Sequence, residues 1–253
     1  GEHAQEWARL AIEEKIEMAK RLMQGTYEVA ARQVAAAVEA KKLPPNSPLV
    51  GEEWLGGPLI TIRTLRMTIQ SMLDIADGHP PRLKRGAVRT RPDGQLAVEV
   101  FPVETWDTML FKDFTAEIWM DPELTEAELP ETMGVFYQRD DPEGKVALVL
   151  GAGNVASIGP LDVVYKLFVE GQVCLLKMNP VNDYLGPFLE EAFAEFLDRG
   201  FLELAYGGAD VGAYLTDHEG VDEIHITGSD RTHDAIVYGV GEEGQRRKAA
   251  DEP

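Results

Sequence analysis

The sequence predicts an α/β protein built around a doubly wound parallel sheet. Its last third alternates short apolar runs with segments of helical character, and a glycine-rich turn follows the first run. Strands separated by crossover helices run parallel, and strands that are apolar throughout are buried on both faces. The four predicted strands are residues 146–150, 173–176, 202–205 and 223–226. The helices expected between and after them lie at about 160–170, 185–199 and 211–216, and after Gly228-Ser229.

The N-terminal third, residues 1–84, reads as helices that pack on this sheet domain. Apolar residues recur at helical spacing from Ala8 to Met23 and again from Val29 to Val38, so we expect two helices separated at Gly25. Residues 46–58 contain three glycines and are expected to form a loop. A further helix is predicted from about Leu59 to Ala76.

Residues 85–134 have the features of a hairpin insertion. Asp93-Gly94 is a hairpin-type turn, and alternating apolar residues follow it. The segment 109–120 is strand-like and carries too many large apolar groups for a free-standing ribbon. A basic stretch over 82–91 precedes an acidic one over 104–143, which indicates either solvated loops or a subunit contact.

Composition excludes several classes of function. The chain has 253 residues with 24 Lys and Arg against 44 Asp and Glu, a formal charge of −20, so neither nucleic acid nor an anionic membrane surface is an expected partner. No apolar run is long enough to span a bilayer, and no signal peptide is apparent, so we expect a cytoplasmic protein. The single cysteine excludes a disulfide framework, and the five histidines lack metal-ligand spacing, so no metal site is expected. The polar tail 241–248 is expected to be mobile.

The glycine turn after the first strand has two interpretations. Gly151 to Ala156, Gly-Ala-Gly-Asn-Val-Ala, matches the dinucleotide fingerprint G-x-G-x-x-G/A, in which the loop cradles a pyrophosphate. That fingerprint requires an acidic residue about 20 positions on, to hold the ribose hydroxyls. The second strand ends instead in Lys177, a cation that cannot accept a hydrogen bond.

The order of motifs over residues 135–240 supports the second interpretation, because it resembles the nucleotide-binding domain of the aldehyde dehydrogenase superfamily. Asn154 stands where the family's Pro-Trp-Asn turn has its asparagine, Lys177 ends the second strand, and Thr227-Gly228-Ser229 opens a helix. The resemblance implies a Rossmann-like core over 135–253 that binds NAD or NADP. It also implies that Asn154 stabilises an oxyanion and that the cofactor contacts Lys177, Gly207, Gly208, Gly228 and Ser229.

The chemistry of these residue types agrees with such roles. An asparagine amide on a strand-to-helix turn can donate a hydrogen bond to a developing oxyanion without changing charge. Free backbone N–H groups at a helix start can bind a phosphate.

The sequence departs from the family at three places. Pro180 replaces the glutamate that holds the ribose hydroxyls, so NADP is as plausible as NAD. The turn Ala152-Gly153-Asn154-Val155 resembles the acyl-CoA reductase branch of the superfamily. The family's catalytic cysteine lies on a downstream domain that this chain does not contain, and Cys174, in an apolar strand, is expected to be a buried inert thiol.

We therefore predict the cofactor-binding part of an NAD(P)-dependent, aldehyde dehydrogenase-like oxidoreductase that acts on a small aldehyde or acyl substrate. Two alternatives remain: an acyl-CoA reductase of the same superfamily, and a non-catalytic nucleotide-binding protein. The hairpin segment resembles the family's oligomerisation arm, which implies a homo-oligomer, a dimer or a tetramer.

Overall fold

The computed structural model describes residues 1–44 and 46–252, which form two compact units. The first unit combines Gly1–Ile69 with Asp140–Pro253, and the second is Gln70–Arg139. The predicted insertion, 85–134, lies within the second unit.

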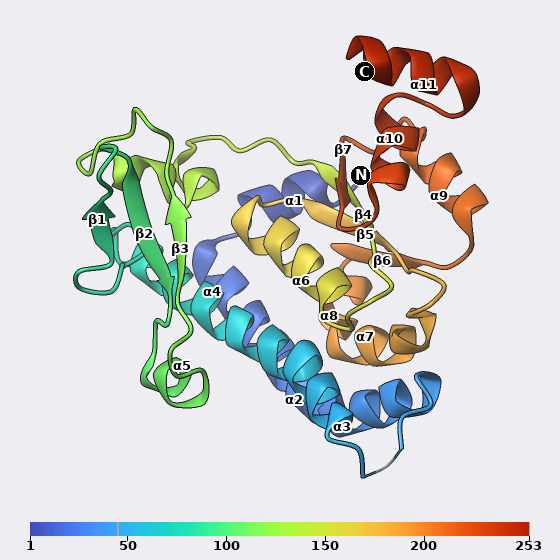
Figure 1. Cartoon of the computed structure of the whole chain (residues 1–253), viewed down its shortest axis with the longest axis horizontal. Helices are drawn as coiled ribbons and strands as arrows, with labels where there is room; N and C mark the ends of the chain where they lie inside the picture. Colours follow the sequence, from blue (N-terminus) through green and yellow to red (C-terminus); the bar gives the residue numbers. More distant parts are fainter. Residues whose placement is uncertain (45, 253) are drawn as a thin grey trace. The chain divides into compact units, whose positions relative to one another are not determined.

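A four-stranded parallel sheet forms the centre of the first unit (Figure 1). Its strands are β4 (Val146–Leu150), β5 (Val173–Lys177), β6 (Leu202–Ala205) and β7 (Glu223–Ile226). They stand in the order β6-β5-β4-β7, so the chain moves outward from β4 to β6 and then returns past β4 to β7. Because such crossovers are right-handed, the connections before this reversal and the connection after it lie on opposite faces of the sheet. The predicted doubly wound α/β fold and its four strands are confirmed.

Helices connect the strands nearly where they were expected. The connections are α6 (Ile158–Val164) with the π-helix η4 (Tyr165–Val169), η5 (Asp183–Leu185), α7 (Gly186–Ala192), α8 (Ala194–Asp198) and α9 (Ala209–Thr216). After β7 come α10 (Asp230–Val237) and α11 (Gly241–Ala250).

One expectation for these helices was wrong, and one segment is helical where no helix was expected. The single helix predicted over 185–199 is two helices, because the backbone leaves helical geometry at Phe193, whose side chain is buried against Phe196. The polar tail 241–248, which we expect to be mobile, lies in helix α11, with acidic residues in its first turn and basic ones in its last, as the helix dipole favours.

The N-terminal helices are α1 (Ala4–Arg9), α2 (Ile12–Ala40), α3 (Leu49–Trp54), the π-helix η1 (Leu55–Leu59) and α4 (Ile60–Ala76). The predicted break at Gly25 was wrong, because α2 continues through it. A Cβ at this position would lie 3.0 Å from the Ala192 carbonyl oxygen, so the glycine allows α2 to approach α7 closely. The loop expected over 46–58 is largely helical as well.

Trp7 fixes the start of the chain to the sheet's helices. The Trp7 side chain is fully buried, and its indole N–H donates to the Leu167 carbonyl at 3.0 Å. Its ring packs on Phe168, Phe196 and Phe201, with centroids 4.9–5.9 Å apart. Aromatic packing of this kind adds to the stability gained by burial alone.

The second unit contains an antiparallel sheet of order β1-β2-β3. Its elements are β1 (Val88–Thr90), β2 (Leu96–Phe101), α5 (Thr105–Leu110), β3 (Ala116–Trp119), η2 (Leu129–Thr132) and η3 (Val135–Gln138). The predicted hairpin at Asp93-Gly94 is confirmed, with Gly94 at φ +91°. Only the last part of the strand expected over 109–120 is a strand.

The basic stretch of this unit is largely neutralised within the unit itself. Lys84 pairs with Glu99 at 3.0 Å, and Arg89 pairs with Glu117. Arg91 lies over the ring of Trp119, 3.6 Å from its centroid. These pairs give the basic residues an internal role.

Candidate functional site

The carboxyl ends of the four parallel strands meet along one edge of the sheet. Lys177 is in register with Leu150 on one side and Ala205 on the other, and Leu150 is in register with Ile226. The four segments that follow therefore leave the sheet side by side. The residues singled out from the sequence all lie at this edge: Lys177 is the last residue of β5, and the segments that follow the strands contain Asn154, Gly207, Gly208, Gly228 and Ser229. In open α/β sheets, this edge is where ligands bind, at the point where strand order reverses, here between β4 and β7.

Lys177 ends β5 as a buried residue, with 7% of its surface exposed. Burial lowers the pKa of its ammonium group, and the Asp210 carboxylate partly offsets this shift. Among the described residues, the ammonium has no hydrogen bond or salt bridge recorded. A partly desolvated donor at the carboxyl edge suits a ligand hydroxyl or phosphate oxygen.

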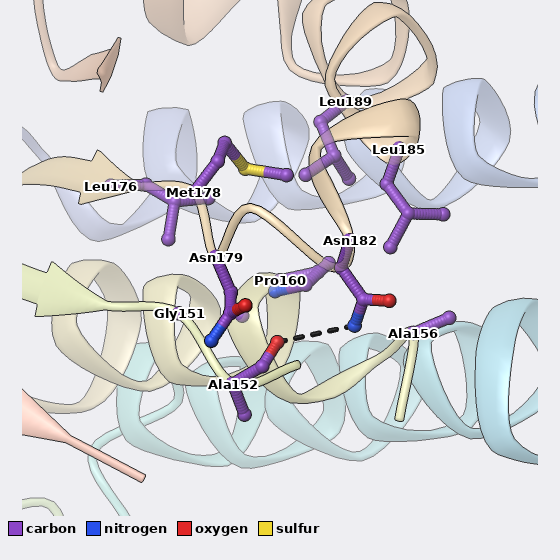
Figure 2. A pocket seen from close by; sticks show the side chains of 11 residues that line it. Gly151, Ala152, Ala156, Pro160, Leu176, Met178, Asn179, Asn182, Leu185 and Leu189 are labelled. Atoms are coloured by element: carbon purple, nitrogen blue, oxygen red, sulfur yellow. Dashed lines mark hydrogen bonds between the residues drawn. The ribbon is translucent and has the colours of Figure 1, made fainter. Parts of the chain in front are cut away.

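The glycine turn after β4 packs against the segment after β5. The Gly151 N–H donates to the Lys177 carbonyl at 3.0 Å. A Cβ on Gly153 would lie only 2.8 Å from Asn179 Oδ1, so the Asn179 side chain already occupies the space beside this glycine. The Asn182 side-chain amide donates to the Ala152 carbonyl at 3.1 Å, as Figure 2 shows.

The cavity under this turn is small. It has a volume of about 10 Å³ and a largely apolar lining that includes Ala156, Leu176 and Leu185 (Figure 2). A space of this size holds at most about one water molecule. It is therefore a packing gap below the turn, and a nucleotide has no room there.

Asn154 lies at the exposed tip of the turn. Within residues 1–44 and 46–252, no hydrogen bond to its side chain is recorded, so the amide does not serve to close the turn. The far end of the turn is fixed, because the Ser157 N–H donates to the Gly56 carbonyl at 3.1 Å. Gly56 also packs against Val155, because a Cβ placed on Gly56 would lie 3.4 Å from Val155 Cγ1. The amide of Asn154 is thus free to meet a ligand on a turn held at both ends.

The segment after β6 requires glycine at position 207, because a side chain there would clash. Gly207 adopts φ +135°, and a Cβ there would lie 2.5 Å from Val211 Cγ2. Gly208 is the N-cap of α9. Both therefore have a structural role in the entry to that helix.

The segment after β7 leads into the N-terminus of α10. Ser229 caps this helix, with its Oγ accepting from the Thr232 N–H at 3.3 Å. The Asp230 carboxylate accepts from the Arg231 N–H at 2.9 Å, so a bound phosphate would compete with it for that donor. A Cβ on Gly228 meets only ordinary contacts.

Asp162 on α6 fixes the residues that precede this helix. It accepts from Thr227 Oγ1 at 3.0 Å, and its other oxygen lies 3.3 Å from His225 Nε2. Asp162 was not predicted from the sequence, and no local motif marks it, because its partners are more than 60 residues away. Asn179 and Asn182 were also missed, although Asn-Pro-x-Asn is a typical turn sequence.

Cys174 is buried, and burial raises the pKa of its thiol well above the usual range. The expectation of a buried thiol is confirmed, and Cys174 is not a candidate nucleophile. Among the described residues, no three His, Cys, Asp or Glu side chains come together as metal ligands. None of the helices in that part of the chain combines the length and apolar character needed to cross a bilayer.

Comparison with solved structures supports the fold. The chain is similar to an aldehyde dehydrogenase from Bartonella henselae, at 14% identity and a TM-score of 0.57 over 94% of this chain and 39% of that one. It is also similar to an NADP complex of glyceraldehyde-3-phosphate dehydrogenase from Methanocaldococcus jannaschii, at 12% identity and a TM-score of 0.54 over 95% of this chain and 42% of that one. A third similar structure is the NADP-dependent glyceraldehyde-3-phosphate dehydrogenase from Bacillus halodurans, also bound to NADP. The identity is 16% and the TM-score 0.52, over 95% of this chain and 41% of that one.

These likenesses establish an aldehyde dehydrogenase-type fold. The chain spans about two fifths of the length of the structures that it matches. No protein-family model matches the sequence, and no curated protein matches it.

Proposed function

We propose that this chain is the cofactor-binding part of an NAD(P)-dependent oxidoreductase that acts on an aldehyde. The observation that carries the proposal is the register of the sheet, which aligns Lys177, Leu150 and Ile226 in one row. The row brings the Asn154 turn, the Lys177 ammonium and the Ser229 cap to the same edge. Two of the structures with this fold are NADP complexes, which supports a nicotinamide nucleotide as the ligand.

Each proposed role follows from what the residue offers. Lys177 donates a hydrogen bond to the adenosine ribose, and Gly228 and Ser229 at the start of α10 face the pyrophosphate. Gly207 and Gly208 shape the adjacent segment. Asn154 donates its amide to the oxygen of the reacting carbonyl, and the nicotinamide, when bound, supplies hydride chemistry.

Pro180 bears on the choice between NAD and NADP. It lies in a turn closed by the Asn182 N–H, which donates to the Asn179 carbonyl at 2.9 Å. Proline suits the second position of such a turn, and this position therefore carries no carboxylate that would repel a 2′-phosphate. We propose that NADP is accepted at least as well as NAD.

Calorimetric titration of the protein with NAD and with NADP tests the proposal. Lys177→Ala should weaken binding by about 1–3 kcal/mol, the cost of a lost hydrogen bond to a charged group. Lys177→Met is the matched control for packing, because it keeps a long unbranched side chain and removes the ammonium group; it should weaken binding equally. Unchanged affinity in both variants would contradict the role of Lys177.

Kinetics of the intact protein tests the role of Asn154. Asn154→Ala should lower kcat about 10²- to 10³-fold, as the loss of one oxyanion donor does, with little change in cofactor affinity. Activity with an aldehyde and NAD(P), compared with activity on an acyl-CoA and NADPH, separates oxidation of an aldehyde from reduction of an activated acyl group. Nucleotide binding without either activity would favour a non-catalytic nucleotide-binding protein.

We also propose self-association through the second unit. Trp106, Phe114 and Ile118 are 61%, 70% and 53% exposed. The strand β3 pairs with β2 on one edge, and within the described residues no strand pairs with the other. Exposed apolar groups beside an unpaired strand edge are typical of an interface between chains.

A further inference from the structure

The Asn154 turn depends on a second, buried asparagine. Between its two backbone anchors, Gly151 to the Lys177 carbonyl and Ser157 to the Gly56 carbonyl, the turn has no helix or strand to support it. Within the described residues, one side-chain hydrogen bond reaches into this interval: the Asn182 amide nitrogen donates to the Ala152 carbonyl oxygen at 3.1 Å. We propose that Asn182 is a positioning residue for Asn154, an inference that rests on the proposed oxyanion role of Asn154.

The hydrogen bond is placed where its loss matters. Asn182 is 3% exposed and Ala152 is 8% exposed, so neither group has ready access to bulk water as a substitute partner. A buried carbonyl that loses its donor costs more free energy than the bond itself contributes, because its desolvation is then uncompensated. The Ala152 carbonyl therefore stays where Asn182 can reach it, two residues before Asn154.

Asn182 is itself fixed in place. Its N–H donates to the Asn179 carbonyl at 2.9 Å, and its own carbonyl accepts from the Leu185 N–H at 3.0 Å. The Asn179 side chain accepts from the Val181 N–H at 3.0 Å, which stabilises the same turn around Pro180. Asn182 precedes η5 but makes no side-chain cap there, so its amide is used on the neighbouring turn instead.

Figure 2 shows this arrangement, with Asn179 and Asn182 both extending from the segment after β5 toward the glycine turn. Asn179 fills the space beside Gly153, and Asn182 holds the preceding carbonyl. An oxyanion donor must be held close to its productive position, since a displacement of about 1 Å can lower a rate about 10²-fold. The two amides therefore contact the turn between its anchors at Gly151 and Ser157.

The proposal requires a hydrogen-bond donor in the side chain at position 182, so substitutions of Asn182 can test it. Asn182→Asp keeps the shape and removes the donor, and its carboxylate would repel the Ala152 carbonyl. Asn182→Ala, as a second variant, removes the donor without adding charge. Asp183→Asn is the matched control, because it changes a charge at the neighbouring exposed residue of the same segment.

Amide hydrogen exchange tests the positioning without any assay of activity. In Asn182→Asp and Asn182→Ala, the Ser157 amide should exchange about tenfold faster, the effect of losing one buried hydrogen bond. The Asp183→Asn control should exchange at the normal rate. Equal exchange in all three variants would overturn the inference.

Kinetics in the intact protein then tests whether the positioning serves Asn154. Asn182→Ala should lower kcat about 10- to 100-fold with little change in the dissociation constant for NAD(P). In the Asn154→Ala background, the same change should cost almost nothing, because the group that it positions is absent. Equal losses in both backgrounds would overturn the link to Asn154. A normal kcat for Asn154→Ala alone would contradict the proposed function, whereas the exchange result would stand on its own.

Discussion

Gly153 offers a direct test of why the turn is rich in glycine. Its φ is outside the left-handed region, so an alanine there meets no backbone strain and any cost is steric. The new Cβ would lie 2.8 Å from Oδ1, 3.0 Å from Cγ and 3.1 Å from Nδ2 of Asn179. Asn179 cannot turn aside freely, because its Oδ1 accepts the Val181 N–H at 3.0 Å.

The expected change in the free energy of unfolding combines two destabilising effects with one stabilising effect. Overpacking of one methyl group costs about 1–3 kcal/mol. Loss of the Asn179–Val181 hydrogen bond costs about 1 kcal/mol. Replacement of glycine restricts the unfolded chain and returns about 0.4–1 kcal/mol. We therefore expect Gly153→Ala to lower the free energy of unfolding by about 2 kcal/mol.

Urea-induced unfolding, followed by tryptophan fluorescence, measures this change, since Trp7 is fully buried in the same unit. In an Asn179→Ala background, the three obstructing atoms are gone and Gly153→Ala should be close to neutral. Gly212→Ala is the control: this glycine lies within α9 with open space around it, so alanine should stabilise the protein by about 1 kcal/mol. An equal cost of Gly153→Ala in both backgrounds would refute the steric explanation.

Two further predictions concern a buried charge and the second unit. Burial lowers the pKa of Lys15 to about 8, so between about pH 8 and its unfolded value near 10.5 the unfolded chain binds more protons than the native one. Stability should therefore rise with pH in this window by up to about 3 kcal/mol, and a urea series on Lys15→Met, which has no proton to lose, should lack the rise. Phe114→Ser with Ile118→Lys should reduce self-association of the protein in sedimentation velocity without changing its NAD(P) affinity. A wild-type protein that is monomeric at all concentrations would contradict the proposed interface.

The sheet could be predicted because its signal is local. Runs such as 146–150 are apolar throughout, and their separation by helical segments admits few arrangements other than a parallel sheet. The same reasoning placed Lys177 at a strand end, and register then brought it beside Leu150 and Ala205. The position of the candidate site at this edge of the sheet could therefore be predicted from where the strands end.

The errors arose where a residue's role depends on a distant partner. Gly25 was interpreted as a helix break, although it serves the close approach of α2 to Ala192, far away in sequence. Asn182 has the composition of a turn residue, and only the fold shows that its amide is buried against a carbonyl 30 residues earlier. Helical periodicity carries no information on such contacts, because they form between elements.

The internal contacts of the glycine turn change how its sequence should be interpreted. A match to the dinucleotide fingerprint is usually explained by a phosphate that needs room above the glycines. Here the Asn179 side chain occupies the space beside Gly153, and Gly151 lies against the Lys177 carbonyl. The glycines are therefore explained by packing within the chain, and their presence is no evidence for a phosphate over the turn. The case for a nucleotide rests instead on Lys177 and on the start of α10, and changes at the glycines should alter stability, whereas changes at Lys177 should alter nucleotide affinity.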